Sequence, residues 1–214
     1  MSTAARRTRP TRSRLRPPAP ATDSRQRLLE SALVVFAEHG FDGATTRDIA
    51  AHAGVNLGLV QYHFGGKEQL WRAAVDHGFE ALWSALAAAA PGAQPVNQLA
   101  ETIRAAVRFA AAHPALVRLM NDEGKRDGRR LRWLVDRHGR RLYDLTTTML
   151  AQARERGVLI DVAPLHLYYT FIGAAGMIFS QAAECRRLTG IDPTASPAII
   201  DAHADVLVRL FLGA

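Results

Sequence analysis

Apolar residues recur at helical spacing along almost the whole chain from residue 23 onward. In residues 23–40 they form one apolar face, which comprises Leu28, Leu29, Ala32, Leu33, Val35 and Phe36. Further helical segments follow near 67–90, 95–112, 115–127, 129–156, 163–188 and 196–212. No stretch of useful length alternates apolar and polar residues as a half-buried strand does. The pattern predicts an all-α protein with about nine helices, three short ones followed by about six longer ones.

Two short helices joined by a very short link are predicted between residues 45 and 64. Thr45 and Asp48 have the spacing of a capping box, and Gly54 is placed to close the first helix. Asn56 is placed to cap the second helix, which runs to about Phe64. The link AGV is typical of a helix-turn-helix motif, whose second helix enters the major groove of DNA. We therefore predict a DNA-binding domain over residues 23–70.

The second of these helices has two contrasting sides on a wheel of about 100° per residue. The side predicted to pack inward comprises Leu57, Val60 and Phe64. The side predicted to project outward comprises Gly58, Leu59 and Tyr62, flanked by Gln61 and His63.

The outward side chains, and some at the neighbouring helix starts, have the chemistry of DNA contacts. Leucine touches thymine methyl groups, glutamine pairs with adenine, and tyrosine, histidine and lysine donate to phosphate oxygens. Free N–H groups at a helix start favour a phosphate beside Thr46. The candidate DNA contacts are Thr46, Arg47, Asn56, Leu57, Gly58, Leu59, Gln61, Tyr62, His63 and Lys67. Taken singly, each residue also fits a solvated surface.

Residues 36–71, FAEHGFDGATTRDIAAHAGVNLGLVQYHFGGKEQLW, resemble the N-terminal DNA-binding domain of the TetR family of bacterial transcription regulators. The shared features are GF then TT before the second helix, IA then AGV at the turn, YHF at the end of the third helix, and K then L at the start of the fourth. The resemblance implies DNA contacts at Thr46, Arg47, Gly58, Tyr62, His63 and Lys67. The family commonly has tyrosine at the place of Gln61 and serine or threonine at that of Asn56, and Leu57 and Leu59 are more apolar than usual. A relative's operator sequence therefore does not carry over.

The resemblance also implies a role for residues 71–214, as a helical domain that binds a small-molecule effector and forms a dimer. It implies a cytoplasmic homodimer, a repressor that the effector releases from a double-stranded DNA operator. The last two helices, near 163–188 and 196–212, are expected to form the dimer interface. The small residues GAAG at 173–176 and the apolar stripe of the last helix fit this interface, and they equally fit an ordinary core within one chain.

An effector pocket requires cavity-lining side chains in the middle helices. The candidates are Phe109, Leu116, Met120, Glu123, Trp133, Tyr143, Met149 and Tyr169. Glu123 is interpreted either as a group that orients a polar part of the ligand or as a surface acid. Methionine and aromatic residues at helical spacing also fit a filled core. The alternative function is therefore an effector-independent DNA-binding protein with a filled C-terminal core.

Charge is distributed unevenly along the chain. The net charge is +7, and residues 1–22 carry six arginines and no acid, whereas residues 23–70 carry four basic and six acidic residues. We predict a disordered arginine- and proline-rich tail over 1–22, acting either as an arm that contacts phosphates or as a solubilising extension. The basic cluster 124–141 fits an acidic ligand, DNA backbone or a solvated helix face.

Enzyme, metal and membrane signals are weak in this sequence. It has no P-loop, no HExxH and no paired cysteines, since Cys185 stands alone. The apolar stretch YYTFIGAAGMIFS is shorter than the roughly 20 residues of a membrane span. We expect no catalytic activity, no cofactor, no metal and no membrane partner. A helical enzyme or carrier with a vestigial DNA-binding head is the remaining alternative.

Overall fold

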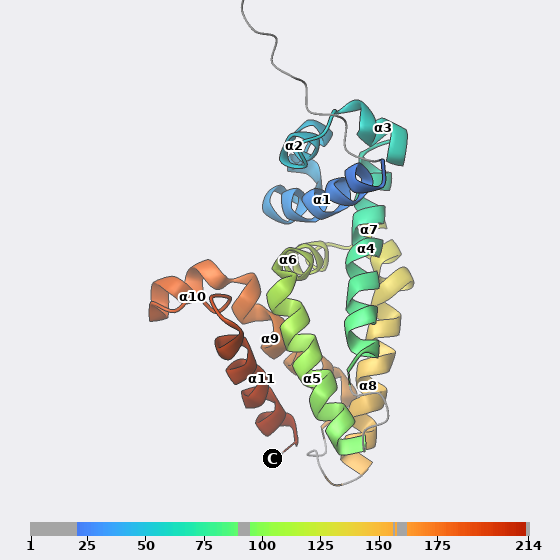
Figure 1. Ribbon diagram of the computed structural model, residues 1–214. Coiled ribbons are helices and arrows are strands. Elements are labelled where there is room, and N and C mark those ends of the chain that lie inside the picture. Colours follow the sequence, from blue (N-terminus) through green and yellow to red (C-terminus); the bar gives the residue numbers. More distant parts are fainter. Residues whose placement is uncertain (1–20, 90–94, 156, 158–161, 213–214) are drawn as a thin grey trace, which may run out of the picture.

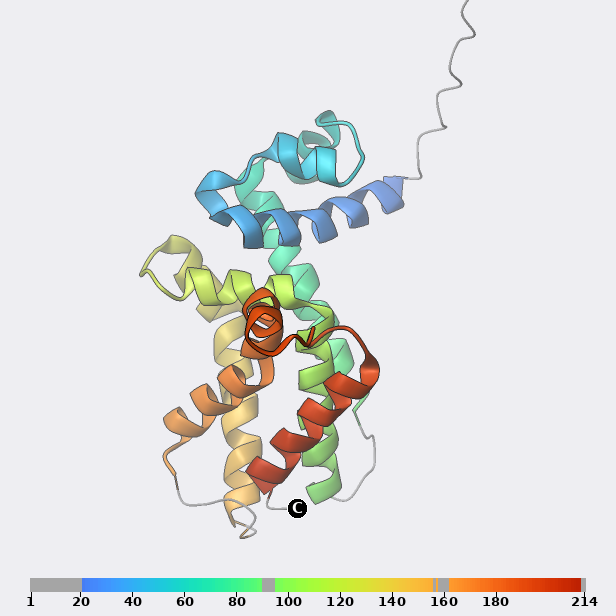
Figure 2. The ribbon, with the colours of Figure 1, turned by 90° about the vertical axis from the view of Figure 1, so that its left-hand side faces the viewer.

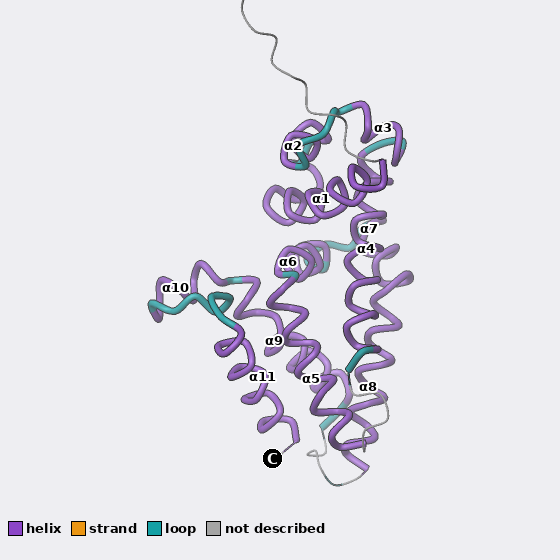
Figure 3. The backbone as a smooth tube through the Cα atoms, in the orientation of Figure 1, coloured by secondary structure: helices purple, strands orange, loops and turns teal. Residues whose placement is uncertain are grey.

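The computed structural model describes residues 21–89, 95–155, 157 and 162–212. Throughout these residues the regular structure is helical and no strand occurs, so the all-α prediction is confirmed (Figure 3). The predicted tail over 1–22 lies almost wholly outside the described residues.

The first four helices follow the predicted order. They are α1 (Ala21–Gly43), α2 (Thr46–His52), α3 (Gly58–Phe64) and α4 (Lys67–Ala87). Gly40 has a left-handed backbone (φ 67°) that kinks α1 at the residue where the sequence predicted a stop. The first helix therefore ends its regular course there, and Phe41 to Gly43 turn the chain towards α2.

The remaining helices form the body of the molecule. They are α5 (Pro95–Ala112), α6 (Pro114–Glu123), α7 (Arg129–Leu134), the π-helical turn η1 (Val135–Gly139), α8 (Arg140–Glu155), α9 (Pro164–Ser180), α10 (Ala182–Thr189) and α11 (Pro197–Leu212). The single helix predicted near 163–188 is divided, because Gln181 has a non-helical backbone (φ −112°, ψ 33°). This break lets α10 project away from the body (Figure 1).

Helices α1, α2 and α3 gather at one end of the molecule, and the long helices α4, α5 and α8 run away from them (Figures 1 and 2). α4 belongs to both parts, because it begins beside α3 and continues down the body. The domain boundary predicted between residues 70 and 71 therefore falls inside α4.

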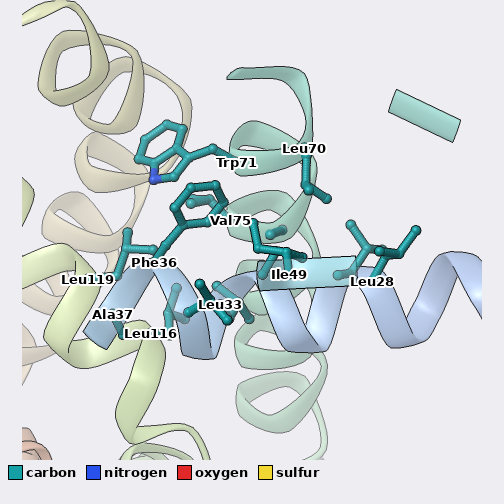
Figure 4. Close-up of a cluster of buried hydrophobic side chains, with 14 of the residues drawn as sticks. Leu28, Leu33, Phe36, Ala37, Ile49, Leu70, Trp71, Val75, Leu116 and Leu119 are labelled. Atoms are coloured by element: carbon teal, nitrogen blue, oxygen red, sulfur yellow. The ribbon is translucent and has the colours of Figure 1, made fainter. Parts of the chain in front are cut away.

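One apolar core spans the predicted boundary and joins the parts of the chain on its two sides. Phe36 of α1, Leu70 and Trp71 of α4, and Leu116 and Leu119 of α6 are all buried in it (Figure 4). Burial of large apolar side chains is the main stabilising contribution to such a junction. The end formed by α1, α2 and α3 is consequently packed on α6 rather than tethered by α4 alone.

A second core holds the other end of the body together. Buried side chains of α5, α8, α9 and α11 meet there, among them Ile103, Val107, Phe179 and Leu207. Two ion pairs fasten α11 across the surface of α5, Arg104 with Asp205 at 3.0 Å and Arg108 with Asp201 at 2.7 Å.

Candidate functional site

The turn between α2 and α3 is built by short-range hydrogen bonds that the sequence predicts. The Asp48 amide donates to the Thr45 hydroxyl at 3.1 Å, and that hydroxyl donates to the Asp48 carboxylate at 2.6 Å. Gly54 takes a left-handed conformation (φ 63°), and the Val55 amide donates to the Ala50 carbonyl at 3.0 Å. These bonds fix the angle at which α3 leaves α2.

Helix α3 begins and ends where its capping residues place it. The Asn56 side-chain oxygen accepts the Gly58 amide at 2.8 Å. Gly65 ends the helix in a left-handed conformation (φ 74°). Val60 is buried in the core that α1 and α4 also enter, and Phe64 is half-buried and packs against this core, as the wheel predicted.

The burial of Leu57 and Leu59 is the reverse of what the helical wheel predicted. Leu57 is 43% exposed, whereas Leu59 is half-buried and packs against the core. A wheel fixes the angle between residues on one helix but not the direction in which neighbouring helices press on it. The packed arc of α3 extends past Val60 towards Leu59, so the prediction that Leu59 projects outward and Leu57 inward was wrong.

The exposed side of α3 carries the strongest candidates for DNA contact. Tyr62 is 77% exposed, the highest value among the exposed aromatic side chains of the described residues. Gly58 and Gln61 are exposed beside it, and Arg47 is exposed on the first turn of α2. A base-reading and phosphate-binding surface needs such uncovered donors and acceptors.

The other candidates lie at the edge of this exposed surface, which we call the rim, and most of them already contact other residues of the protein. His63 is half-buried, and its Nε2 lies 3.2 Å from the Ser24 hydroxyl. The Lys67 ammonium donates to the Asp42 carbonyl at 3.3 Å and lies over the Phe41 ring at 4.6 Å. Thr46 is half-buried at the start of α2. These contacts restrict the side chains and so reduce the entropy lost on binding.

We expect Tyr62→Ala to weaken operator binding by about 10-fold, because one hydrogen bond to a charged phosphate and its ring contacts are lost. The free energy of unfolding should stay unchanged, since the side chain is largely exposed. Titration of labelled operator together with thermal unfolding measures both quantities. Tyr62→Phe, which removes only the hydroxyl, should have an intermediate affinity. Wild-type affinity in the alanine variant would show that this side of α3 does not face DNA.

The body encloses an apolar cavity of about 450 Å³, which we call the effector cavity. Helices α4 to α9 and η1 contribute to its wall. Of the eight side chains predicted to line a pocket, five line this cavity: Phe109, Leu116, Met120, Met149 and Tyr169. Its size falls within the range of about 300–1,000 Å³ for small-molecule sites.

The other three predicted pocket residues do not line the effector cavity, because they are engaged elsewhere. Glu123 pairs with Arg130 at 2.8 Å. Trp133 packs edge-on against Trp71, with ring centroids 5.4 Å apart. Tyr143 packs against Tyr168 at 4.9 Å, and thereby supports a residue of the cavity wall.

The effector cavity also has polar wall residues that the sequence did not single out. They are Thr102, Asn121, Thr146 and Tyr168, with Lys125 at the edge. Burial raises the pKa of the Tyr168 phenol, and the neighbouring Tyr169 and Tyr143 add to this effect, so the hydroxyl remains a neutral donor. Threonine and tyrosine at helical spacing carry no signal of a pocket, since only packing decides whether they meet a cavity.

Known proteins share this arrangement of a helix-turn-helix end and a helical body. Residues 28–74 match the family described as bacterial regulatory proteins, tetR family. Residues 95–210 match the family described as tetracyclin repressor-like, C-terminal domain. The second match covers more than half of the chain. The chain belongs to the TetR family.

Individual relatives within the TetR family agree with this assignment. The transcriptional repressor AcnR of Corynebacterium glutamicum is 48% identical over 52 residues, which are 24% of this chain and 28% of that protein. The chain thus spans less than a third of the length of this relative in the alignment. AcnR of Corynebacterium diphtheriae is 30% identical over 69% of this chain and 74% of that protein.

Solved TetR-like structures share the fold at lower identity. One is the crystal structure of AibR in complex with isovaleryl coenzyme A and operator DNA. It superposes with a TM-score of 0.68 at 19% identity, over 88% of this chain and 98% of that chain. At this identity the likeness establishes the fold alone.

This TetR-family chain leaves an apolar surface on its last long helices, which we call the α9–α11 face. It comprises Tyr169, Gly173 and Met177 of α9 with Val206 and Leu210 of α11, and both helices lie on the same side of the molecule (Figure 2). A side chain added at Gly173 would meet open space, whereas one added at Gly176 would approach Val117 at 3.1 Å. The two glycines of the GAAG segment therefore serve different contacts.

A buried histidine lies between the effector cavity and α4. His138 stacks on Phe79, with ring centroids 4.1 Å apart, and its Nε2 lies 2.7 Å from an Asp76 carboxylate oxygen. Burial lowers the pKa of His138, and the Asp76 carboxylate only partly offsets this. Other residues of the same π-helical turn, Val135 and Gly139, line the cavity.

We expect the lowered pKa of His138 to make the free energy of unfolding fall as pH falls below about 6.5, the ordinary histidine value. The unfolded chain then binds a proton that the folded chain resists, so the loss continues towards the folded-state pKa. His138→Gln should flatten this part of the pH profile in urea unfolding. His39→Gln, at an exposed position of α1, replaces a histidine outside this buried cluster and serves as the control. An unchanged slope in His138→Gln would contradict this assignment.

The described residues contain no group of three histidine, cysteine, aspartate or glutamate side chains placed to hold a metal ion. A search of the same residues finds no helix with the length and apolar character needed to cross a bilayer.

Proposed function

We propose that the protein is a homodimeric repressor that a small-molecule effector releases from a palindromic DNA operator. The effector cavity carries this proposal, because an effector-independent regulator needs no hollow of about 450 Å³ in its body. Two similar proteins, both called AcnR, are named as transcriptional repressors. The structure of AibR contains isovaleryl coenzyme A and operator DNA. Both facts support the proposal. A DNA-bound regulator of this kind acts in the bacterial cytoplasm.

The α9–α11 face supports the dimer. Apart from Gly173, its side chains are large and mainly apolar, and an isologous interface would bury the same patch on both subunits. One helix-turn-helix reads only a half-site, so two copies of α3 are needed for a specific operator. Candidate contacts in each half-site are Arg47, Gln61 and Tyr62 with the rim residues Thr46, His63 and Lys67.

Helix α6 supports the coupling between effector and DNA. Its residues Leu116, Val117 and Met120 line the effector cavity, while Leu116 and Leu119 pack in the core shared with α1. A ligand that favours one position of α6 would therefore favour one position of the DNA-binding end. The ligand shifts this equilibrium only by its difference in affinity for the two arrangements.

Selection of operator fragments from random DNA, with full-length protein at a stated salt concentration, tests the proposed function. The expected result is a palindrome whose half-sites lie about 10 base pairs apart, one helical turn, or a multiple of it. Salt-sensitive binding without any preferred sequence would contradict it, because phosphate contacts alone produce that behaviour.

A further inference from the structure

A second cavity of about 400 Å³ adjoins the effector cavity, and we call it the outer cavity. It lies between the end of α4, the start of α5 and α8. The two cavities share part of their walls, formed by Leu86, Leu99, Thr102, Leu145 and Met149. A ligand longer than the effector cavity would thus extend into the outer cavity.

Among the described residues, the walls of both cavities contain cationic side chains and no acidic ones. Lys125 lines the effector cavity, but Asp122 neutralises it at 2.6 Å. Arg141 lines the outer cavity, and its guanidinium lies over the Trp83 ring, 4.2 Å from the centroid. Within the described residues no hydrogen bond or ion pair to an acid engages this guanidinium, and Arg141 is exposed, so an anion could replace the water around it.

Several arginines of the body pair with no carboxylate in the described residues, and among them Arg141 is the one that lines a cavity. Arg104, Arg130 and Arg137 each pair with a carboxylate. Contact with an aromatic ring uses the positive charge of Arg141 without supplying acceptors for its five N–H donors. A guanidinium held over a ring at the mouth of an apolar hollow matches a carboxylate or phosphate, which accepts two parallel hydrogen bonds.

We propose that the effector is an amphipathic anion, with an apolar body in the effector cavity and a carboxylate or phosphate head on Arg141 in the outer cavity. This inference rests on the proposed function, since it names the class of ligand that the proposed effector site takes. The apolar wall contributes most of the affinity through burial, and Arg141 contributes the selection for charge.

Three probes with the same ten-carbon chain separate charge from apolar burial: sodium decanoate, decyl phosphate and 1-decanol. Calorimetric titration of the full-length protein, below the aggregation concentration of each probe, measures the dissociation constants. At least one anion is expected to bind about 10-fold more tightly than the alcohol, because of its charge-assisted hydrogen bonds. The phosphate and carboxylate arms identify which head group the outer cavity prefers.

Arg141→Gln should weaken binding of the preferred anion by about 10-fold and leave 1-decanol unchanged. Arg140→Gln is the matched control, since Arg140 is the preceding residue on α8, is exposed and lines neither cavity. It removes the same charge and should keep the preference for the anion. Equal binding of anion and alcohol by the wild-type protein, equal losses in the two variants, or binding of none of the probes would overturn the proposal.

Operator binding is measured separately, so that failure of the proposed function can be distinguished from failure of the proposed ligand class. If an anion binds through Arg141 but leaves the operator complex intact, the ligand class stands and effector-induced release is wrong. If the operator is found and the wild-type protein binds none of the probes, the regulator stands and the ligand class is wrong.

Discussion

Leu210→Arg is expected to leave a folded monomer that binds the operator at least about 100-fold more weakly than the wild-type dimer. Leu210 is 73% exposed on α11, so the change costs little stability within one chain. In an isologous dimer, however, the change would bury one new arginine from each subunit in the α9–α11 face, where each charge loses its hydration. Loss of the second DNA-binding end removes the gain of two linked half-sites, which is commonly 100-fold or more.

Sedimentation velocity and operator titration test this result together. Leu210→Met, which keeps the apolar character and approximate volume, should remain a dimer with wild-type affinity. A dimeric Leu210→Arg protein would show that another surface forms the interface. A monomer that retains full affinity would instead contradict the requirement for two linked half-sites.

Trp71→Ala is expected to lower the free energy of unfolding by about 3–5 kcal/mol, the usual cost of removing a large buried aromatic side chain. Trp71 is 0% exposed and packs against Phe41 of the DNA-binding end and Trp133 of α7. Because it lies in the core that joins α1, α4 and α6, its removal should loosen both sides of the junction.

Urea unfolding of matched variants measures this loss. Trp83→Ala removes the same side chain from the same helix, but Trp83 is only half-buried, so the loss should be clearly smaller. Trp71→Phe should be the mildest of the three, because it keeps most of the apolar volume and removes an indole N–H that has no hydrogen-bond partner in the described structure. Equal losses in Trp71→Ala and Trp83→Ala would contradict a special role for the junction.

The DNA-binding end was predictable in detail because its signals are local. The capping box of Thr45 and Asp48, the Asn56 cap and the left-handed Gly54 act within a few residues of themselves, and all occur as the pattern predicted. Which side of α3 packs inward was only half predictable. Val60 was placed correctly, but the neighbouring helices cover Leu59 and leave Leu57 exposed.

The body was predictable as helices but not as a site. The sequence indicated apolar faces, and it could not distinguish a side chain that fills the core from one that lines a cavity. Trp133 and Met149 have the same apolar character in the pattern, yet Trp133 packs on Trp71 and Met149 lines both cavities. The difference arises from how α7 and α8 sit against α4 and α5.

By itself, then, the sequence determined the helical class, the helix-turn-helix and the family, since these depend on hydrogen bonds and apolar spacing within short segments. Only the tertiary structure decided that the body is hollow, that Gly173 meets open space while Gly176 meets Val117, and that Arg141 lies beside an apolar cavity with no acidic partner among the described residues. The reason is physical: burial, cavity volume and charge compensation depend on residues that are distant along the chain and that meet only when the helices pack.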